Sequence, residues 1–259
     1  MKVLSFITAK GGCGKSSLTL EAATVFGNMY GKNKVLVIDL DQQLSLSKNC
    51  GADTEAPSIL DVLQGEIPIM EAVQHNDLFD IIVASPKLAR ADSLFDRAEE
   101  DEYLLADVLD FAKNTYDFVF IDPAPSRNIL QEMLYIAADY IIIPTRVDES
   151  SLDAVATTEN ELNRLTNGRN QKSHAKLIGY VLNEYNKQTA LGQMALETLE
   201  ESSERRGDNP FVATVSPAIR VAEAKTLHTA VCRTEKSSKT GREIYAIVDQ
   251  ILKKMREEA

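Results

Sequence analysis

Eight residues near the start of the chain have the types and spacing of a phosphate-binding loop. The run KGGCGKSS at residues 10–17 follows an apolar stretch at residues 3–7 and precedes a helical pattern. Glycines let backbone N–H groups converge on phosphate oxygens, and the N-terminus of the following helix adds its dipole. In such a loop Lys15 reaches the β- and γ-phosphates, and the Ser16 hydroxyl binds Mg²⁺. The predicted phosphate-binding residues are Gly11, Gly12, Cys13, Gly14, Lys15, Ser16 and Ser17.

The loop departs from the ordinary pattern at its start. A glycine usually stands six residues before the lysine. This chain has Ala9 at that position, followed by a second lysine, Lys10. An extra cation so early in the loop needs a role of its own.

Two aspartates follow buried apolar stretches further along the chain. Asp41 comes just after residues 35–38, and Asp122 closes residues 118–121. Because ligands bind beyond the carboxyl ends of parallel strands, Asp122 is placed to secure Mg²⁺ through the water shell of the metal, and Asp41 to orient an attacking water. Taken alone, an aspartate after a strand is more often a helix cap or a turn former, and Asp39 with Asp41 also fits a solvated loop.

Apolar stretches alternate with helical periods along the whole chain. This alternation predicts a single doubly wound α/β domain over residues 1–259, with a mostly parallel sheet and helices on both faces. We expect Ser150 to cap a helix that runs to about residue 165, with Asp153 as its capping-box partner. The expected strands span residues 3–7, 35–38, 79–84, 118–121, 140–143, 177–183 and 211–215, and the main helices residues 92–115 (broken near 99–102), 129–138, 187–206 and 244–255.

Charge and cysteine content narrow the class of protein. The net charge is −11, but residues 1–159 carry −14 whereas residues 160–259 carry +3. The basic half fits either a solvated surface or a face that meets an anionic partner. Three cysteines without metal-ligand spacing, and no room for a signal peptide before the first strand, predict a cytoplasmic protein.

The motifs resemble the ParA/MinD family of P-loop ATPases. Residues 10–17 are similar to the deviant Walker A motif of that family, which carries a second lysine near its start. Residues 35–43 resemble its D-x-D-P-Q motif, and residues 116–126 its Y-D-x-x-x-x-D-x-P-P-S motif. Residues 215–224 are similar to the ParA-branch segment I-P-x-x-x-R-x-x-E-A.

The resemblance implies roles for individual residues. Lys10 would cross to the phosphates of a partner subunit in a homodimer that holds two ATP molecules. Asn183 would hydrogen-bond the adenine, with Pro217 beside the base. Gln42 replaces the usual proline of the second motif, and Ala124 the first proline of the third, so the rate of ATP hydrolysis could differ from that of relatives. We expect a Mg²⁺-dependent ATPase that is slow without a partner.

The ParA branch positions plasmids, chromosomal loci or protein cargo, and we favour it. It implies ATP-dependent, non-specific DNA binding, association with the nucleoid of a bacterium or archaeon, and a ParB-like or cargo-adaptor protein that stimulates hydrolysis. Arg220 and Lys225 are the candidate DNA contacts.

Two alternatives remain open. One is a MinD-like regulator that binds membrane through its last helix, although the tail at residues 253–259 ends acidic and disfavours insertion. The other is a metabolic or metal-cluster enzyme on the same scaffold, for which extra cysteine ligands would be expected.

Overall fold

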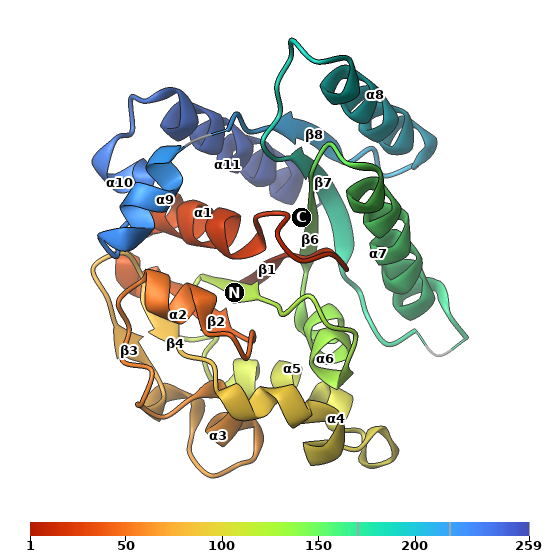
Figure 1. Cartoon of the computed structure of the whole chain (residues 1–259). Coiled ribbons are helices and arrows are strands. Elements are labelled where there is room, and N and C mark those ends of the chain that lie inside the picture. The colour runs from red at the N-terminus through yellow and green to blue at the C-terminus, as the bar shows by residue number, and fades with distance from the viewer. Residues whose placement is uncertain (170, 218, 259) are drawn as a thin grey trace.

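A single sheet runs through the molecule, and helices cover both of its faces (Figure 1). The computed structural model describes residues 1–169, 171–217 and 219–258. Its strands are β1 (Lys2–Phe6), β2 (Val35–Asp39), β3 (Gln74–His75), β4 (Asp80–Ile82), β5 (Phe118–Asp122), β6 (Tyr140–Thr145), β7 (Lys176–Leu182) and β8 (Phe211–Thr214). They lie in the order β3-β4-β2-β5-β1-β6-β7-β8, and only the pairing of β3 with β4 is antiparallel. The predicted doubly wound, mostly parallel α/β fold is confirmed.

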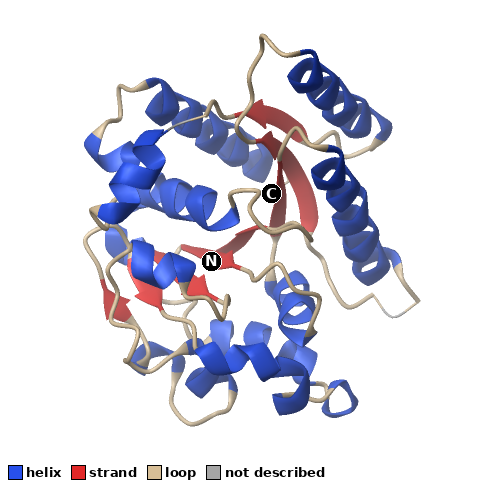
Figure 2. Cartoon of the chain, viewed as in Figure 1, coloured by secondary structure: helices blue, strands red, loops and turns tan. Residues whose placement is uncertain are grey.

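A short turn joins β3 to β4, and helical segments connect the other successive strands; Figure 2 colours helices and strands separately. They are α1 (Lys15–Tyr30), α2 (Ser45–Asn49), α3 (Ile59–Leu63), α4 (Ala91–Leu94), α5 (Leu104–Asp110), α6 (Ile129–Ala137), α7 (Glu149–Asn167), α8 (Ala190–Arg205), α9 (Ile219–Thr226), α10 (Val231–Thr234) and α11 (Lys239–Glu257). Short 3₁₀ turns lie at Lys32–Lys34, Ile69–Glu71, Pro86–Arg90, Arg97–Glu99 and Asp101–Tyr103. Among the helices of the described residues, none has the length and apolar character needed to cross a bilayer.

The central strands are buried on both faces, which explains their continuous apolar sequences. In β2, Leu36 and Ile38 pack into a cluster with side chains of α3, α5, α6, α7 and α8. Their neighbours Val35 and Val37 point to the opposite face, into a cluster with α1, α2, α10 and α11. The carboxyl ends of the parallel strands therefore meet at one edge, between the two helical layers.

Several boundaries differ from those expected. Strand β4 is shorter than the predicted residues 79–84, and the antiparallel edge strand β3 was not predicted. The expected helical region at residues 92–115 breaks where predicted, but only α4 and α5 are α-helical within it.

The start of α7 corrects the predicted cap. Asp148, not Ser150, is the N-cap, and its carboxylate accepts the backbone N–H of Ser151 at 3.1 Å. Asp and Ser cap helices about equally well. Here the aspartate stands three residues before the free N–H, and Ser150 is left to contact Lys10 instead.

Candidate functional site

The glycine-rich loop connects β1 to α1 at the carboxyl edge of the sheet. Gly12 and Gly14 have φ angles of +79° and +96°, a left-handed conformation that side chains disfavour. A Cβ at Gly14 would stand 2.2 Å from Nδ2 of Asn183, so that position is also closed by space. Gly11 has room, with Pro125 as its nearest neighbour at 3.8 Å. Because the loop has glycines at these positions, it adds no side chains of its own over its backbone there, just before the N-terminus of α1.

Lys15 lies inside the site and faces acidic side chains. Only 6% of its surface is exposed, and its Nζ donates a hydrogen bond of 3.2 Å to the carbonyl oxygen of Lys10. Burial lowers the pKa of Lys15, while the negative charges of Asp122 and Asp41 oppose that change. The arrangement places one buried ammonium group where phosphates would meet the loop.

Two fully buried aspartates end adjacent strands beside the loop. Asp39 of β2 and Asp122 of β5 are paired in register. Asp39 accepts hydrogen bonds from the backbone N–H and the hydroxyl of Ser47 and from the N–H of Asp41. Burial, followed by the other carboxylate nearby, raises the pKa of Asp122, and burial raises the pKa of Asp39 to about 6. The reading of Asp39 as part of a solvated loop is therefore wrong.

Asp122 has the properties of a group that awaits a cation. Within the described residues, neither carboxylate oxygen of Asp122 has a hydrogen-bond partner, although both are buried. Such a group is costly unless it is paired or contacts a metal through ordered water. The donor set therefore fits the predicted Mg²⁺, an oxygen-loving cation that keeps several waters.

Asp41 lies at the rim of the same edge. It is 8% exposed, and its Oδ1 accepts the N–H of Gln43 at 3.0 Å. This contact fixes the carboxylate beside the loop, close enough to Lys15 for their charges to interact. The predicted trio of Lys15, Asp41 and Asp122 is thus brought together.

Lys10 has a different environment from Lys15. Its ammonium group forms an ion pair with Asp148 and donates hydrogen bonds to the hydroxyls of Ser150 and Ser151, at 2.6 and 2.9 Å. The Asp148 carboxylate accepts hydrogen bonds from Lys10 and from the hydroxyls of Ser151 and Ser150, and these bonds, that from Lys10 first, hold the pKa of Asp148 well below its usual range. Sequence reasoning missed Asp148; the only available signal was an aspartate three residues before Ser151, a capping spacing.

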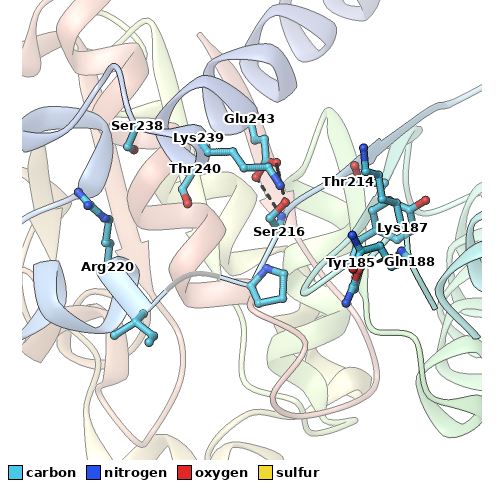
Figure 3. A pocket seen from close by; sticks show the side chains of 13 residues that line it. Tyr185, Lys187, Gln188, Thr214, Ser216, Arg220, Ser238, Lys239, Thr240 and Glu243 are labelled. Carbon is cyan, nitrogen blue, oxygen red and sulfur yellow. Dashed lines mark hydrogen bonds and ion pairs between the residues drawn. The ribbon is translucent and has the colours of Figure 1, made fainter.

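Of the two residues predicted to contact the base, Asn183 touches the glycine-rich loop and Pro217 lines a pocket. Asn183 Nδ2 donates to the carbonyl oxygen of Cys13 at 3.3 Å, so this side chain packs against the loop itself. Pro217 lines an open pocket of about 940 Å³ between β8 and α11 (Figure 3). The segment that holds Pro217 includes residue 218, which is outside the described residues.

The two candidate DNA contacts lie in unlike settings. Arg220 lines the pocket (Figure 3). Its side chain is 58% exposed and forms an ion pair with Glu235. Lys225 instead reaches the phosphate-binding loop, where its Nζ donates to the Ser17 hydroxyl at 2.5 Å. Arg220 and Lys225 therefore do not lie together on one exposed basic face.

Comparisons with known proteins show which family the chain resembles. Residues 1–175 match the family model AAA_31, described as an AAA domain. The chain is 26% identical over 230 residues to the chromosome partitioning protein ParA of Caulobacter vibrioides, covering 86% of this chain and 84% of that protein.

Solved structures show the same fold. The chain resembles McdA of Cyanothece with a TM-score of 0.84 and 18% identity, over 97% of this chain and 99% of McdA. It also resembles a putative plasmid partition protein of Borrelia burgdorferi bound to AMPPNP, with a TM-score of 0.78, 22% identity and 98% of each chain covered.

Proposed function

The chain belongs to the AAA_31 family of AAA domains and, within it, to the ParA/MinD P-loop ATPases, and from this we propose that it is a ParA-type ATPase that positions cargo. The observation that best supports this proposal is that Asp122 and Lys15 are both buried beside the glycine loop, where their charges interact. We propose ATP as the substrate and Mg²⁺ as the metal, with residues 1–259 as one ATPase domain. The AMPPNP bound to the Borrelia protein supports this choice of ligand.

The residues divide the work of hydrolysis between them. The loop N–H groups and Lys15 would bind the phosphates, while Ser16 and Asp122 would hold Mg²⁺. Bound Mg²⁺ would draw negative charge from the phosphate oxygens. Asp41 would orient a water for in-line attack, since its carboxylate is fixed at the rim of the site. Hydrolysis by such a site alone would be slow, and a ParB-like or cargo-adaptor protein would stimulate it.

Lys10 supplies the proposed link to a second subunit. In the single chain its charge is satisfied by Asp148, outside the loop. We propose that ATP binding draws two subunits together and that each Lys10 leaves Asp148 for the phosphates of the other subunit. A cation supplied in trans stabilises phosphate charge as an arginine finger does. Gly11 would allow the two backbones to approach.

DNA is the proposed surface on which the dimer acts. Arg220 is exposed and reaches solvent from a half of the chain that is net basic. Two copies in a dimer would double weak phosphate contacts, so binding would depend on ATP and fall with salt. This would place the protein on the nucleoid.

The alternative of membrane binding through the last helix has less support. The apolar side of α11 packs into the core through Ile244, Ile247, Val248, Ile251, Leu252 and Met255. A membrane-binding role would need those side chains to leave the core, which would expose a large apolar area.

The test is co-sedimentation with non-specific DNA and with anionic liposomes, each with and without ATP. We expect ATP-dependent sedimentation with DNA, weakened severalfold by Arg220→Ala and lost at high salt. The matched control is Lys253→Ala, because Lys253 is exposed on the far end of α11. Three results together would replace the proposal with the MinD-like alternative. ATP-loaded protein would fail to bind DNA at low salt, it would bind liposomes, and deletion of residues 242–259 would abolish the liposome binding.

A further inference from the structure

Lys225 is a lysine of α9 that enters the nucleotide site. Its Nζ lies 2.5 Å from the Ser17 hydroxyl, although 208 residues separate the two in sequence. In Figure 1, α9 and α10 lie beside α1, the helix that begins with the glycine loop. Neither the predicted role in DNA binding nor the proposed mechanism uses this contact.

Among the described residues, no carboxylate pairs with the ammonium group of Lys225. It is half-buried, and among the described residues it forms no ion pair within 4.0 Å. It also lies at the N-terminus of α1, where the helix dipole is positive and the first turn contains no acidic residue. Burial lowers the pKa of Lys225, and the charges of Glu21 and Asp122 only partly oppose this. An anion bound at this position would therefore stabilise the charged form of Lys225.

The segment that carries Lys225 is anchored on both sides of the site. The buried carboxylate of Glu21 in α1 accepts the N–H groups of Val231 and Cys232, at 2.8 and 2.9 Å. His228 Nδ1 lies 2.9 Å from the carbonyl oxygen of Lys48, in the helix that follows Asp41. These contacts hold α9 in place, so Lys225 is directed into the site by packing and is not a freely moving surface lysine.

The position of Lys225 indicates which phosphates it would meet. Lys15 interacts with both Asp41 and Asp122, and Asp41 marks the end of the site where water would attack. Lys225 interacts with Asp122 and Glu21, and its partner Ser17 lies one residue deeper in α1 than the Mg²⁺ ligand Ser16. The contact with Ser17 places the ammonium group at the first turn of α1, where the loop would hold the phosphates.

We propose that Lys225 is a nucleotide-binding residue whose ammonium group contacts the phosphates that ADP and ATP have in common. The proposal rests on the proposed function, since it requires a nucleotide in the glycine loop. It also makes α9 a structural link between the occupied site and the neighbouring Arg220, because the phosphate charge would hold α9 against α1.

The test is calorimetric titration of the full chain with ADP and with a non-hydrolysable ATP analogue. Lys225→Met should weaken both ligands about tenfold, the effect of one charge-assisted hydrogen bond. Lys225→Arg should retain most of the affinity, and the exposed control Lys253→Met should retain all of it. Without nucleotide, the melting temperature of Lys225→Met should equal or exceed that of the unaltered protein, because an unpaired buried cation is removed.

The outcomes separate the two proposals. An ADP affinity of Lys225→Met within twofold of the unaltered protein overturns the role of Lys225 and leaves the proposed function intact. So does a loss confined to the ATP analogue, or a fall in melting temperature that Lys225→Arg fails to restore, because these indicate another contact or a structural role. If the unaltered protein binds neither ADP nor the analogue, the proposed function itself fails.

Discussion

The carboxyl edge of the central strands and the segment at residues 219–238 differ in how they are built. At the strand edge, Asp39, Asp122 and Lys15 are almost entirely buried. Their positions can be predicted from the residues next to them in the sequence. In the later segment Ile219 and Leu227 are 80% and 73% exposed, and its contacts reach residues more than 170 positions away. In our proposal the buried edge holds the nucleotide, and the later segment reaches that site through Lys225.

The largest expected effect comes from removing the buried cation of the strand edge. Lys15→Ala should reduce ATP affinity at least about 100-fold, because truncating one member of a buried charge cluster costs about 3 kcal/mol or more. Arg220→Ala, in the exposed segment, should leave ATP affinity unchanged. Calorimetric titration measures both. If the ATP affinity of Lys15→Ala were within tenfold of that of the unaltered protein, the buried strand edge would not be the main nucleotide-binding region.

Removing a buried carboxylate from the strand edge should change the stability of the protein in a pH-dependent way. Because the pKa of Asp122 is raised on folding, its charge destabilises the native state once pH rises above the value for an unfolded carboxyl. Asp122→Asn should therefore be more stable than the unaltered protein without nucleotide, and the difference should grow from pH 5 to pH 8. It should reach about 1–2 kcal/mol.

Urea unfolding without Mg²⁺ or nucleotide measures this difference. The exposed carboxylate of Asp110 offers a matched control, since Asp110→Asn should show no such trend. In a separate ATP-binding measurement, Mg²⁺ should strengthen ATP binding to the unaltered protein but not to Asp122→Asn. A variant that is less stable at pH 8 than at pH 5, relative to the unaltered protein, would contradict the account.

A smaller effect should follow from releasing Lys10. Asp148→Asn keeps an oxygen that can accept the N–H of Ser151 at the start of α7, but it removes the charge that holds Lys10. A half-exposed ion pair contributes up to about 1 kcal/mol. The ATP concentration for half-maximal dimerisation should therefore fall about threefold, as measured by light scattering. A higher ATP requirement would mean that Asp148 acts within the dimer itself.

Most of the fold was predictable because its signals are local. The apolar stretches that become β2, β5 and β6 are buried on both faces, so each is a short continuous apolar run, the pattern and length typical of a strand in a parallel sheet. The loop at residues 10–17 and the aspartates after β2 and β5 were likewise identified from neighbouring residues. The edge strand β3 has two residues and gives no pattern.

The long-range contacts of Lys10 and Lys225 could not be predicted in the same way. Lys10 meets Asp148 across 138 residues, and Lys225 meets Ser17 across 208. Nothing in the sequence near Lys225 distinguishes it from a solvated lysine of the basic half. Asp148 was missed because Ser150 is also an acceptable helix cap, and only the packing of α7 against the loop decides between them.

We propose that Lys10 of a second subunit completes the glycine loop. The most direct test is the mass in solution, measured by light scattering with ADP, with ATP and Mg²⁺, and for Lys10→Ala with ATP and Mg²⁺. We predict the monomer mass of 28.6 kDa with ADP, twice that mass with ATP, and the monomer mass for Lys10→Ala even when ATP is bound. A protein that stays monomeric with saturating ATP, or a Lys10→Ala variant that dimerises normally, would contradict the claim.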